Sequence, residues 1–139
     1  MKLALDTDVI VAALRSPEGA SAAILRKIVR GELGFAATVA LALEYESVCT
    51  KIEHQLAADV TSDDAAIFID AILAAAKAVD TQFLWRPQLH DIADDMVLSA
   101  AIRGRVDYLV TFNPGRFGDT PAKFGIDVLL PREAWRKIA

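Results

Sequence analysis

Short apolar runs alternate with longer amphipathic stretches along most of the chain. Residues 2–6 (KLALD) form a continuous apolar run bounded by polar residues, which is typical of a buried strand. Four further runs have the same character, namely residues 34–38 (GFAAT), 81–87 (TQFLWRP), 107–113 (DYLVTFN) and 125–131 (GIDVLLP). Because these runs are continuous rather than alternating, we expect both faces of each strand to be covered.

Between these runs, apolar residues recur at helical spacing. Helices are expected over residues 9–19, 20–33, 39–52, 61–79, 91–105 and 131–139. The fourth of these has the strongest local signals, because Thr61 or Ser62 can cap it and Asp63 and Asp64 suit its positive end. Strands that alternate with helices predict an α/β fold: one three-layer α/β/α domain over residues 1–139, with a central, mostly parallel sheet of four to five strands.

The composition of the chain mainly indicates where in the cell the protein is found. The chain has 139 residues, of which 54% are hydrophobic and 24% are charged, as in a globular domain. Its net charge of -4 argues only weakly against broad electrostatic attraction to nucleic acid. The single cysteine, Cys49, has no partner for a disulfide, and the first residues resemble neither a signal peptide nor a membrane span. We therefore expect a cytoplasmic protein without a membrane association.

Oxygen-bearing side chains follow several predicted strands, where ligands bind in open parallel sheets. Asp6 ends the first strand, and Glu44 lies in the helix after the second. Asp94 and Asp95 lie in the first turns of the helix after the third strand, and Asn113 ends the next strand. Carboxylates brought together in this way repel one another unless a cation neutralises their charge.

A hard divalent cation, Mg²⁺ or Mn²⁺, suits such a set of oxygen ligands. A zinc site is not indicated, since Cys49 is alone and His54 and His90 are isolated along the sequence. A Mg²⁺ ion held by few carboxylates keeps positions for phosphate oxygens and for an attacking water. The pattern therefore favours phosphodiester hydrolysis.

Each acid also has a purely structural interpretation. Asp6 has the position of a helix N-cap, and Asp8 that of a first-turn acid favoured by the helix dipole. Glu44 would be a solvated residue in that interpretation. Its spacing from Leu41 and Val48 instead places it on the core-facing side of its helix.

The helical period separates the three acids at the start of the helix over residues 91–105. Asp94 continues the apolar stripe of Val97, which is expected to face the sheet, so its carboxylate should point over the strand ends. Asp95 is rotated away from that stripe. Asp91 is the candidate N-cap of this helix.

Three stretches together resemble the PIN-domain ribonucleases. Residues 5–14 (LDTDVIVAAL) look like the opening of that family, a hydrophobic strand that ends in Asp-Thr-Asn and leads into an apolar helix. Residues 37–48 (ATVALALEYESV) look like its second acidic element. Residues 90–113 resemble the Asp-Pro-x-Asp-Asp segment, apolar helix and following strand of its bacterial toxin branch, the VapC-like toxins. The resemblance extends from Lys2 to about Phe117.

By that resemblance, Asp6, Glu44 and Asp94 are the catalytic residues and the ligands of Mg²⁺ or Mn²⁺. The implied activity is a metal-dependent endoribonuclease, which leaves the phosphate on the 5′ side of the product. Asn113 stands where a fourth acid is common in the family, and Asp8 stands where Asn is usual. Both are secondary candidates for the site.

Three more residues are candidates. Asp95 adds a negative charge near the third ligand, and Thr111 either hydrogen-bonds a ligand carboxylate or simply ends its strand. Arg116 is either a contact for substrate phosphate or an exposed loop charge. The hypothesis for the reaction is in-line attack of a metal-activated water on an RNA phosphodiester.

The resemblance also implies partners: an RNA substrate, an antitoxin protein and a second copy of the chain in a homodimer. The apolar residues of the first helices and Trp135 are candidates for the dimer surface, but they suit a core equally well.

Two other function classes stay open. A haloacid-dehalogenase-like phosphatase also begins with a hydrophobic strand and Asp-x-Asp, and Asp6 would be its nucleophile. Its later acidic pair should follow a hydrophobic strand, whereas Asp94 and Asp95 follow polar residues and open a helix. The second alternative is a catalytically weak PIN domain that binds RNA or a protein, and Asn113 in place of an acid keeps it open.

Overall fold

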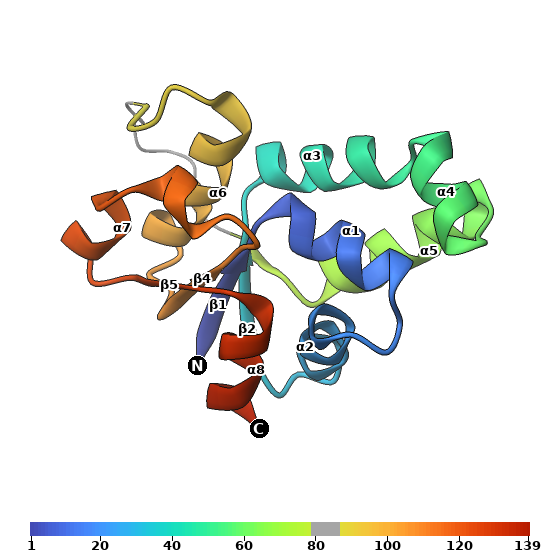
Figure 1. The fold of residues 1–139 in the computed structure, drawn as a ribbon, viewed down its shortest axis with the longest axis horizontal. Helices are drawn as coiled ribbons and strands as arrows, with labels where there is room; N and C mark the ends of the chain where they lie inside the picture. Colours follow the sequence, from blue (N-terminus) through green and yellow to red (C-terminus); the bar gives the residue numbers. More distant parts are fainter. Residues whose placement is uncertain (79–86) are drawn as a thin grey trace.

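Five strands form one parallel sheet in the computed structural model of the chain, which describes residues 1–78 and 87–139 (Figure 1). The strands are β1 (Lys2–Leu5), β2 (Gly34–Ala37), β3 (Lys77–Ala78), β4 (Tyr108–Val110) and β5 (Asp127–Leu129). Their order is β3-β2-β1-β4-β5, and each neighbouring pair is parallel. The expected α/β fold with a parallel sheet of four to five strands is therefore confirmed.

β1 lies at the centre of the sheet, where the order of the strands reverses. Leu3 is aligned with Phe35 of β2 and with Tyr108 of β4, and Leu5 is aligned with Val110. The side chains of β1 from Leu3 to Leu5 are fully buried, which explains why this run contains no alternating polar residue. In open parallel sheets the crevice at such a reversal is the usual ligand site.

Helices cover both faces of the sheet. They are α1 (Thr7–Arg15), α2 (Ala20–Val29), α3 (Val39–Cys49), α4 (Ile52–Ala58), α5 (Ser62–Ala74), α6 (Ile92–Arg103), α7 (Thr120–Lys123) and α8 (Pro131–Ile138), and a 3-10 turn, η1, spans Pro114–Phe117. α6 packs on β1, β2 and β4, whereas α1 packs on α2 and α3. Figure 1 shows α1, α2 and α5 to one side of the sheet and α6 to the other.

The helix expected over residues 39–52 is α3, which ends three residues earlier, and α4 follows it. α3 ends at Cys49, where the Thr50 hydroxyl donates to the Glu46 carbonyl oxygen at 2.8 Å, and Lys51 adopts an extended conformation before α4 begins. A threonine hydroxyl that bonds the backbone in this way competes with the regular helical pattern. The predicted helix is therefore confirmed over Val39–Cys49, whereas its end was placed too late and α4 was not predicted.

The helix expected over residues 61–79 is shorter than its alanine content indicates. α5 ends at Ala74, and Lys77–Ala78 forms β3, which pairs with Ala36 and Ala37 of β2. The open edge of β2 offers backbone hydrogen bonds, and these outweigh the weak intrinsic preference of alanine for a helix. The strand expected over residues 81–87 lies, apart from Pro87, outside the described residues.

The apolar residues of α1 and the side chain of Trp135 contribute to the core. Val9 and Ile10 are fully buried, and Trp135 is partly buried against the same cluster. The Lys27 Nζ atom lies 5.7 Å from the centre of the Trp135 ring. Within the described residues, no helix has the length and apolar character needed to cross a membrane.

α6 is held close to the sheet at its C-terminal end. A Cβ atom at Gly104 would lie 2.5 Å from the Ala36 Cβ atom on β2, so only glycine permits this approach. At its other end, the Asp91 side chain accepts a hydrogen bond from the Asp94 N–H at 2.9 Å, which confirms Asp91 as the N-cap. Both contacts fix the start of α6 over the carboxyl ends of the strands.

Candidate active site

A pocket of about 370 Å³ lies at the carboxyl end of β1. Its charged and titratable lining residues are Asp6, Asp8, Glu44, His54, Asp91, Asp94 and Arg116. The fold thus brings together the three ligands expected from the sequence, Asp6 from the end of β1, Glu44 from α3 and Asp94 from α6. Five carboxylates and one guanidinium give this pocket a strongly negative lining.

Asp6 has the N-cap position of α1, but its side chain makes no capping hydrogen bond. Its Oδ2 atom instead accepts a hydrogen bond from the Thr111 hydroxyl at 2.7 Å. Both side chains are buried, and Thr111 directly follows β4. The Asp6 side chain therefore does not cap α1, although that was its purely structural interpretation.

Thr111 uses its hydroxyl in two hydrogen bonds. The oxygen donates to Asp6 and accepts from the Asn113 N–H at 3.0 Å, so its orientation is set by its neighbours. Thr111 was expected either to hydrogen-bond a carboxylate of the site or simply to end its strand, and the bond to Asp6 matches the first interpretation. Such a contact orients the carboxylate before any ligand arrives.

Asp8 lies one residue beyond the start of α1 and faces the segment after β4. Its Oδ2 atom accepts from the Phe112 N–H and from the Asn113 Nδ2, each at 3.2 Å. The two positions that depart from the family pattern, Asp8 and Asn113, thus contact each other.

Burial and the nearby Asp6 charge raise the pKa of Asp8 from 3.8 to about 6. The bonds from Phe112 and Asn113 and the charge of Arg116 act in the opposite direction, toward a lower pKa, but do not outweigh these effects. Asp8 therefore loses part of its negative charge just below neutral pH.

Glu44 is positioned by its neighbour in α3. The Tyr45 hydroxyl donates a hydrogen bond to the Leu5 carbonyl oxygen, which attaches α3 to the end of β1. The buried side of α3 consists of Leu41, Tyr45 and Cys49. Glu44 lies beside this side of the helix, whereas the sequence analysis had placed it on the core-facing side itself. There it is partly buried, and it lines the pocket, whereas Glu46 is exposed.

Asp94 is almost completely buried, with 7% of its surface exposed. Burial, Asp91 and Asp6 raise its pKa, whereas the Arg116 charge lowers it. The Arg116 Nη1 atom lies 3.9 Å from the Asp94 Oδ1 atom. Arg116 belongs to η1 and lines the pocket, so the loop charge expected from the sequence lies beside the carboxylates.

Asp95 does not line the pocket, although it is as buried as Asp94. Its Oδ1 atom accepts from the Gln88 N–H at 2.8 Å and from the Leu89 N–H at 3.2 Å. These bonds tie the segment before α6 to the helix. The geometry therefore favours a structural role for Asp95 over a secondary place in the site. This agrees with the helical period, which predicted that Asp95 is rotated away from the side of α6 that carries Val97.

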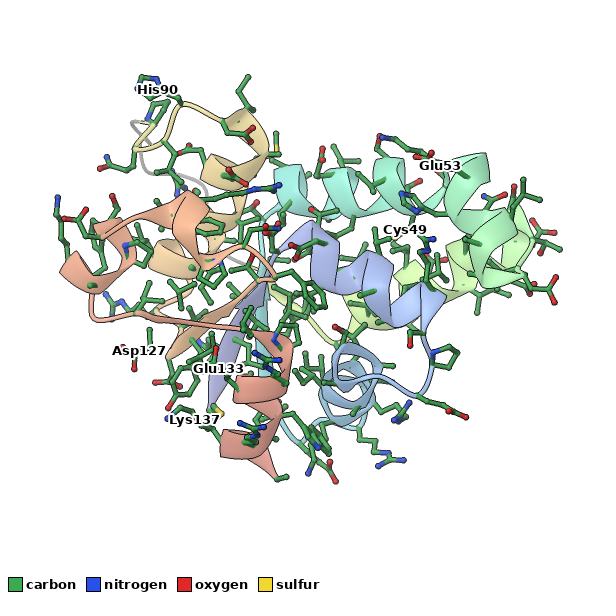
Figure 2. All side chains as sticks on the ribbon, viewed as in Figure 1. Cys49, Glu53, His90, Asp127, Glu133 and Lys137 are labelled. Atoms are coloured by element: carbon green, nitrogen blue, oxygen red, sulfur yellow. The ribbon has the colours of Figure 1, made fainter. Side chains whose placement is uncertain are left out.

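His54 is a lining residue that sequence reasoning missed. It lies on α4, and its Nε2 atom is 3.8 Å from the Glu53 carboxylate. Figure 2 shows Glu53 at the α4 end of the molecule and His90 on the distant segment before α6. Only the break between α3 and α4 turns His54 toward the acids, and no local signal in the sequence marked that turn.

Three buried polar atoms have no hydrogen-bond partner within residues 1–78 and 87–139: Thr7 Oγ1, Asp8 Oδ1 and His54 Nδ1. All three belong to residues that line this pocket. Buried polar groups are nearly always hydrogen-bonded in folded proteins. Their concentration in one place indicates that this pocket takes a polar ligand or ordered water.

The donors of the pocket fit a hard divalent cation by their chemistry. Carboxylate oxygens are the ligands that Mg²⁺ and Mn²⁺ prefer, and the pKa of Asp94 is raised first by burial and then by the neighbouring carboxylates of Asp91 and Asp6. As the side chains stand, no three acidic or imidazole groups in the described part of the chain are grouped to hold one ion. Mg²⁺ commonly binds through one or two carboxylates and several waters, which this pocket can supply.

Comparison with known proteins agrees with the fold and with the sequence resemblance. A family model described as PIN domain matches residues 2–114. No curated protein and no solved structure gives a significant match. The matched range includes β1, α3 and α6, which carry Asp6, Glu44 and Asp94, and it extends just past the end of β4. PIN domains are generally nucleases that typically use divalent metal ions. The chain belongs to the PIN-domain family.

Proposed function

We propose that this PIN domain is a Mg²⁺- or Mn²⁺-dependent endoribonuclease. The observation that carries the proposal is the convergence of Asp6, Glu44 and Asp94 on one pocket from three separate elements. Family membership supports nuclease activity, and the oxygen-rich lining supports a divalent metal ion. When bound, such an ion lowers the pKa of water and stabilises charge that develops on a phosphate.

Within this proposal, Asp6 and Asp94 hold the cation, and Glu44 is the third ligand or orients the attacking water. Asp6 suits its role because the Thr111 hydroxyl fixes its carboxylate. Asp94 is held by the cap of α6 and is nearly buried, which keeps water from screening its charge. Glu44 is more accessible and retains the freedom to adjust to a ligand.

Arg116 has the position of a phosphate contact. Its ion pair with Asp94 is long, at 3.9 Å, and its side chain is 55% exposed, so the guanidinium has donors left for a substrate. Guanidinium groups bind phosphate oxygens through paired N–H donors. His54 faces the same pocket from α4 and is a second donor for the substrate backbone.

We further propose that the protein acts as the toxin of a toxin–antitoxin pair and forms a homodimer. A groove of about 460 Å³ between α1, α2 and α5 supports a protein partner. It is lined by apolar side chains such as Leu25 and Phe68, together with Arg26 and Arg30. Expression that arrests growth, and rescue by the product of an adjacent gene, would test the toxin role. Sedimentation of the purified chain would test the dimer.

Cleavage of labelled RNA tests the nuclease function. Wild-type protein should cut RNA with Mg²⁺ or Mn²⁺ and should be inactive in EDTA. Glu44→Gln should reduce the rate by about 100-fold, since loss of a metal or water contact has this order of effect. Glu46→Gln is the matched control, because Glu46 is exposed on the same helix. RNA binding without any cleavage by the wild type would instead favour the binding-only alternative.

A further inference from the structure

The pocket lined by Asp6, Glu44 and Asp94 is called the acidic pocket. A second cavity, of about 380 Å³, lies on the other side of Phe112 from it. Its wall contains small side chains from α1 and the start of α2, including Ser16 and Ala20, and a second wall comes from Leu130 and Arg132 at the start of α8. Cavities of about 300–1,000 Å³ are the usual size for small organic ligands. No residue of this cavity has a place in the proposed metal chemistry.

Phe112 connects this cavity to the acidic pocket. Its backbone N–H donates to the Asp8 Oδ2 atom, and its neighbour Thr111 bonds Asp6. Phe112 lines the second cavity and is 46% exposed, so a ligand can reach it. Along α1, Asp8 and Ala12 share one face at a spacing of four residues, so this helix also runs from one cavity to the other.

Each of the two cavities has one arginine in its lining. Arg116 lines the acidic pocket, and Arg132 lines the second cavity from the exposed first turn of α8. Arg132 makes no ion pair among those seen in residues 1–78 and 87–139. An apolar cavity with an aromatic ring and an unpaired guanidinium at its edge matches a nucleotide, because the ring stacks on a base and the cation contacts a phosphate.

We propose that Phe112 and Arg132 form a subsite for one unpaired nucleobase and its phosphate, next to the phosphodiester that the acidic pocket receives. This inference rests on the proposed nuclease function. It adds that the enzyme recognises an unpaired base beside the phosphodiester that is cut. A base engaged in a duplex is stacked on both faces, so it cannot present a face to the Phe112 ring. The subsite therefore selects RNA with an unstacked base beside the cleavage position.

Fluorescence titration with a single-stranded RNA that contains 2-aminopurine tests the subsite in EDTA, where cleavage does not interfere. Phe112→Ala should weaken binding by about 10–100-fold, the range for loss of one aromatic–base stack, and Phe112→Trp should restore it. Arg132→Gln should weaken binding by a smaller factor and flatten its salt dependence. The same RNA in a duplex should bind equally to wild type and Phe112→Ala.

Two matched controls belong to the titration. Phe124 is exposed to a similar extent, 51%, and lines neither cavity, and Arg136 lies one turn beyond Arg132 on α8. Phe124→Ala and Arg136→Gln should bind RNA as the wild type does. In cleavage assays with Mn²⁺, Phe112→Ala should raise KM much more than it lowers kcat.

The outcomes separate this inference from the nuclease function. If Phe112→Ala binds and cleaves RNA as the wild type does, while Asp6→Asn abolishes cleavage, the subsite is overturned and the acidic pocket stands. Equal loss of binding in Phe112→Ala and Phe124→Ala would also overturn it. If Asp6→Asn cleaves normally, the nuclease function itself fails, whatever the result at Phe112.

Discussion

The strand side and the helix side of the acidic pocket hold their carboxylates in different ways. On the strand side, Asp6 and Asp8 follow β1, and each is hydrogen-bonded to the segment after β4. On the helix side, Asp94 has a long ion pair with Arg116. Within the described part of the chain, Glu44 has neither a hydrogen bond nor an ion pair.

The difference indicates a division of roles. The carboxylates of Asp6 and Asp8 are each held by hydrogen bonds from residues 111–113, so the strand side fixes where a cation would bind. On the helix side, the Glu44 side chain has no such bond within the described residues and is more accessible, so it can move toward that cation at low cost. Substitutions on the strand side should therefore disturb the site even without removing a ligand, whereas on the helix side only the ligands themselves should matter.

The largest effects are expected from the proposed ligands, one on each side of the pocket. Asp6→Asn and Asp94→Asn should each lower kcat for RNA cleavage by at least about 100-fold, because each removes a charge that binds the cation. Single-turnover cleavage with Mn²⁺ measures this loss. Asp127→Asn is the control: it removes the same charge from β5, and Figure 2 places Asp127 away from α3 and α4. Equal rates in all three variants would refute the site.

A smaller loss is expected when only the orientation of Asp6 is disturbed. Thr111→Val keeps the shape of the buried side chain but removes the hydroxyl that donates to Asp6. The rate of cleavage should fall by about 10–100-fold, as for other residues that orient metal ligands. Ser99→Val in α6, which lines neither cavity, serves as a comparison for a lost hydroxyl. A Thr111→Val variant as active as wild type would remove the distinction between the two sides.

The contact between Asp8 and Asn113 can be tested by swapping the acid and the amide. Asn113→Asp alone should lower the melting temperature, because it places a second carboxylate within hydrogen-bond distance of Asp8. Asp8→Asn together with Asn113→Asp should recover most of that loss, since the amide and the acid again face each other. A double-mutant cycle should give a coupling free energy of about 1 kcal/mol or more. Additive effects on the free energy of unfolding would contradict the contact.

The smallest expected effect is the pH dependence that Asp8 contributes to stability. The pKa of Asp8 in the folded protein, about 6, lies above its ordinary value of 3.8. The charged form therefore destabilises the fold above pH 6, and this cost disappears as the pH falls from 6 toward 4. In EDTA, Asp8→Asn should be more stable than wild type at pH 7.5 by about 1 kcal/mol, after screening by water.

Thermal unfolding at the two pH values checks this prediction. The gain of Asp8→Asn over wild type should shrink toward zero at pH 4, because Asp8 is then protonated in both the folded and the unfolded protein. Asp127→Asn should show no such change. A gain of the same size at both pH values would mean that the Asp8 charge is not what destabilises the protein.

The convergence of Asp6, Glu44 and Asp94 could be predicted from the sequence because parallel topology brings strand ends to one edge. Asp91 was predictable as a cap because that contact is local. The bond between Asp6 and Thr111 joins residues 105 positions apart, so spacing along the chain carried no information about it. His54 was missed for a similar reason, since its direction depends on the end of α3 at Cys49 and the start of α4 at Ile52, which no glycine or proline marks in the sequence.

Binding of Mn²⁺, measured by electron paramagnetic resonance, tests most directly whether Asp6, Glu44 and Asp94 form one cation site. The account predicts that the wild type binds Mn²⁺ and that Asp6→Asn, Glu44→Gln and Asp94→Asn each weaken this binding by about 10-fold or more, whereas Asp127→Asn binds as the wild type does. No Mn²⁺ binding by the wild type, or wild-type affinity in all three variants, would contradict it.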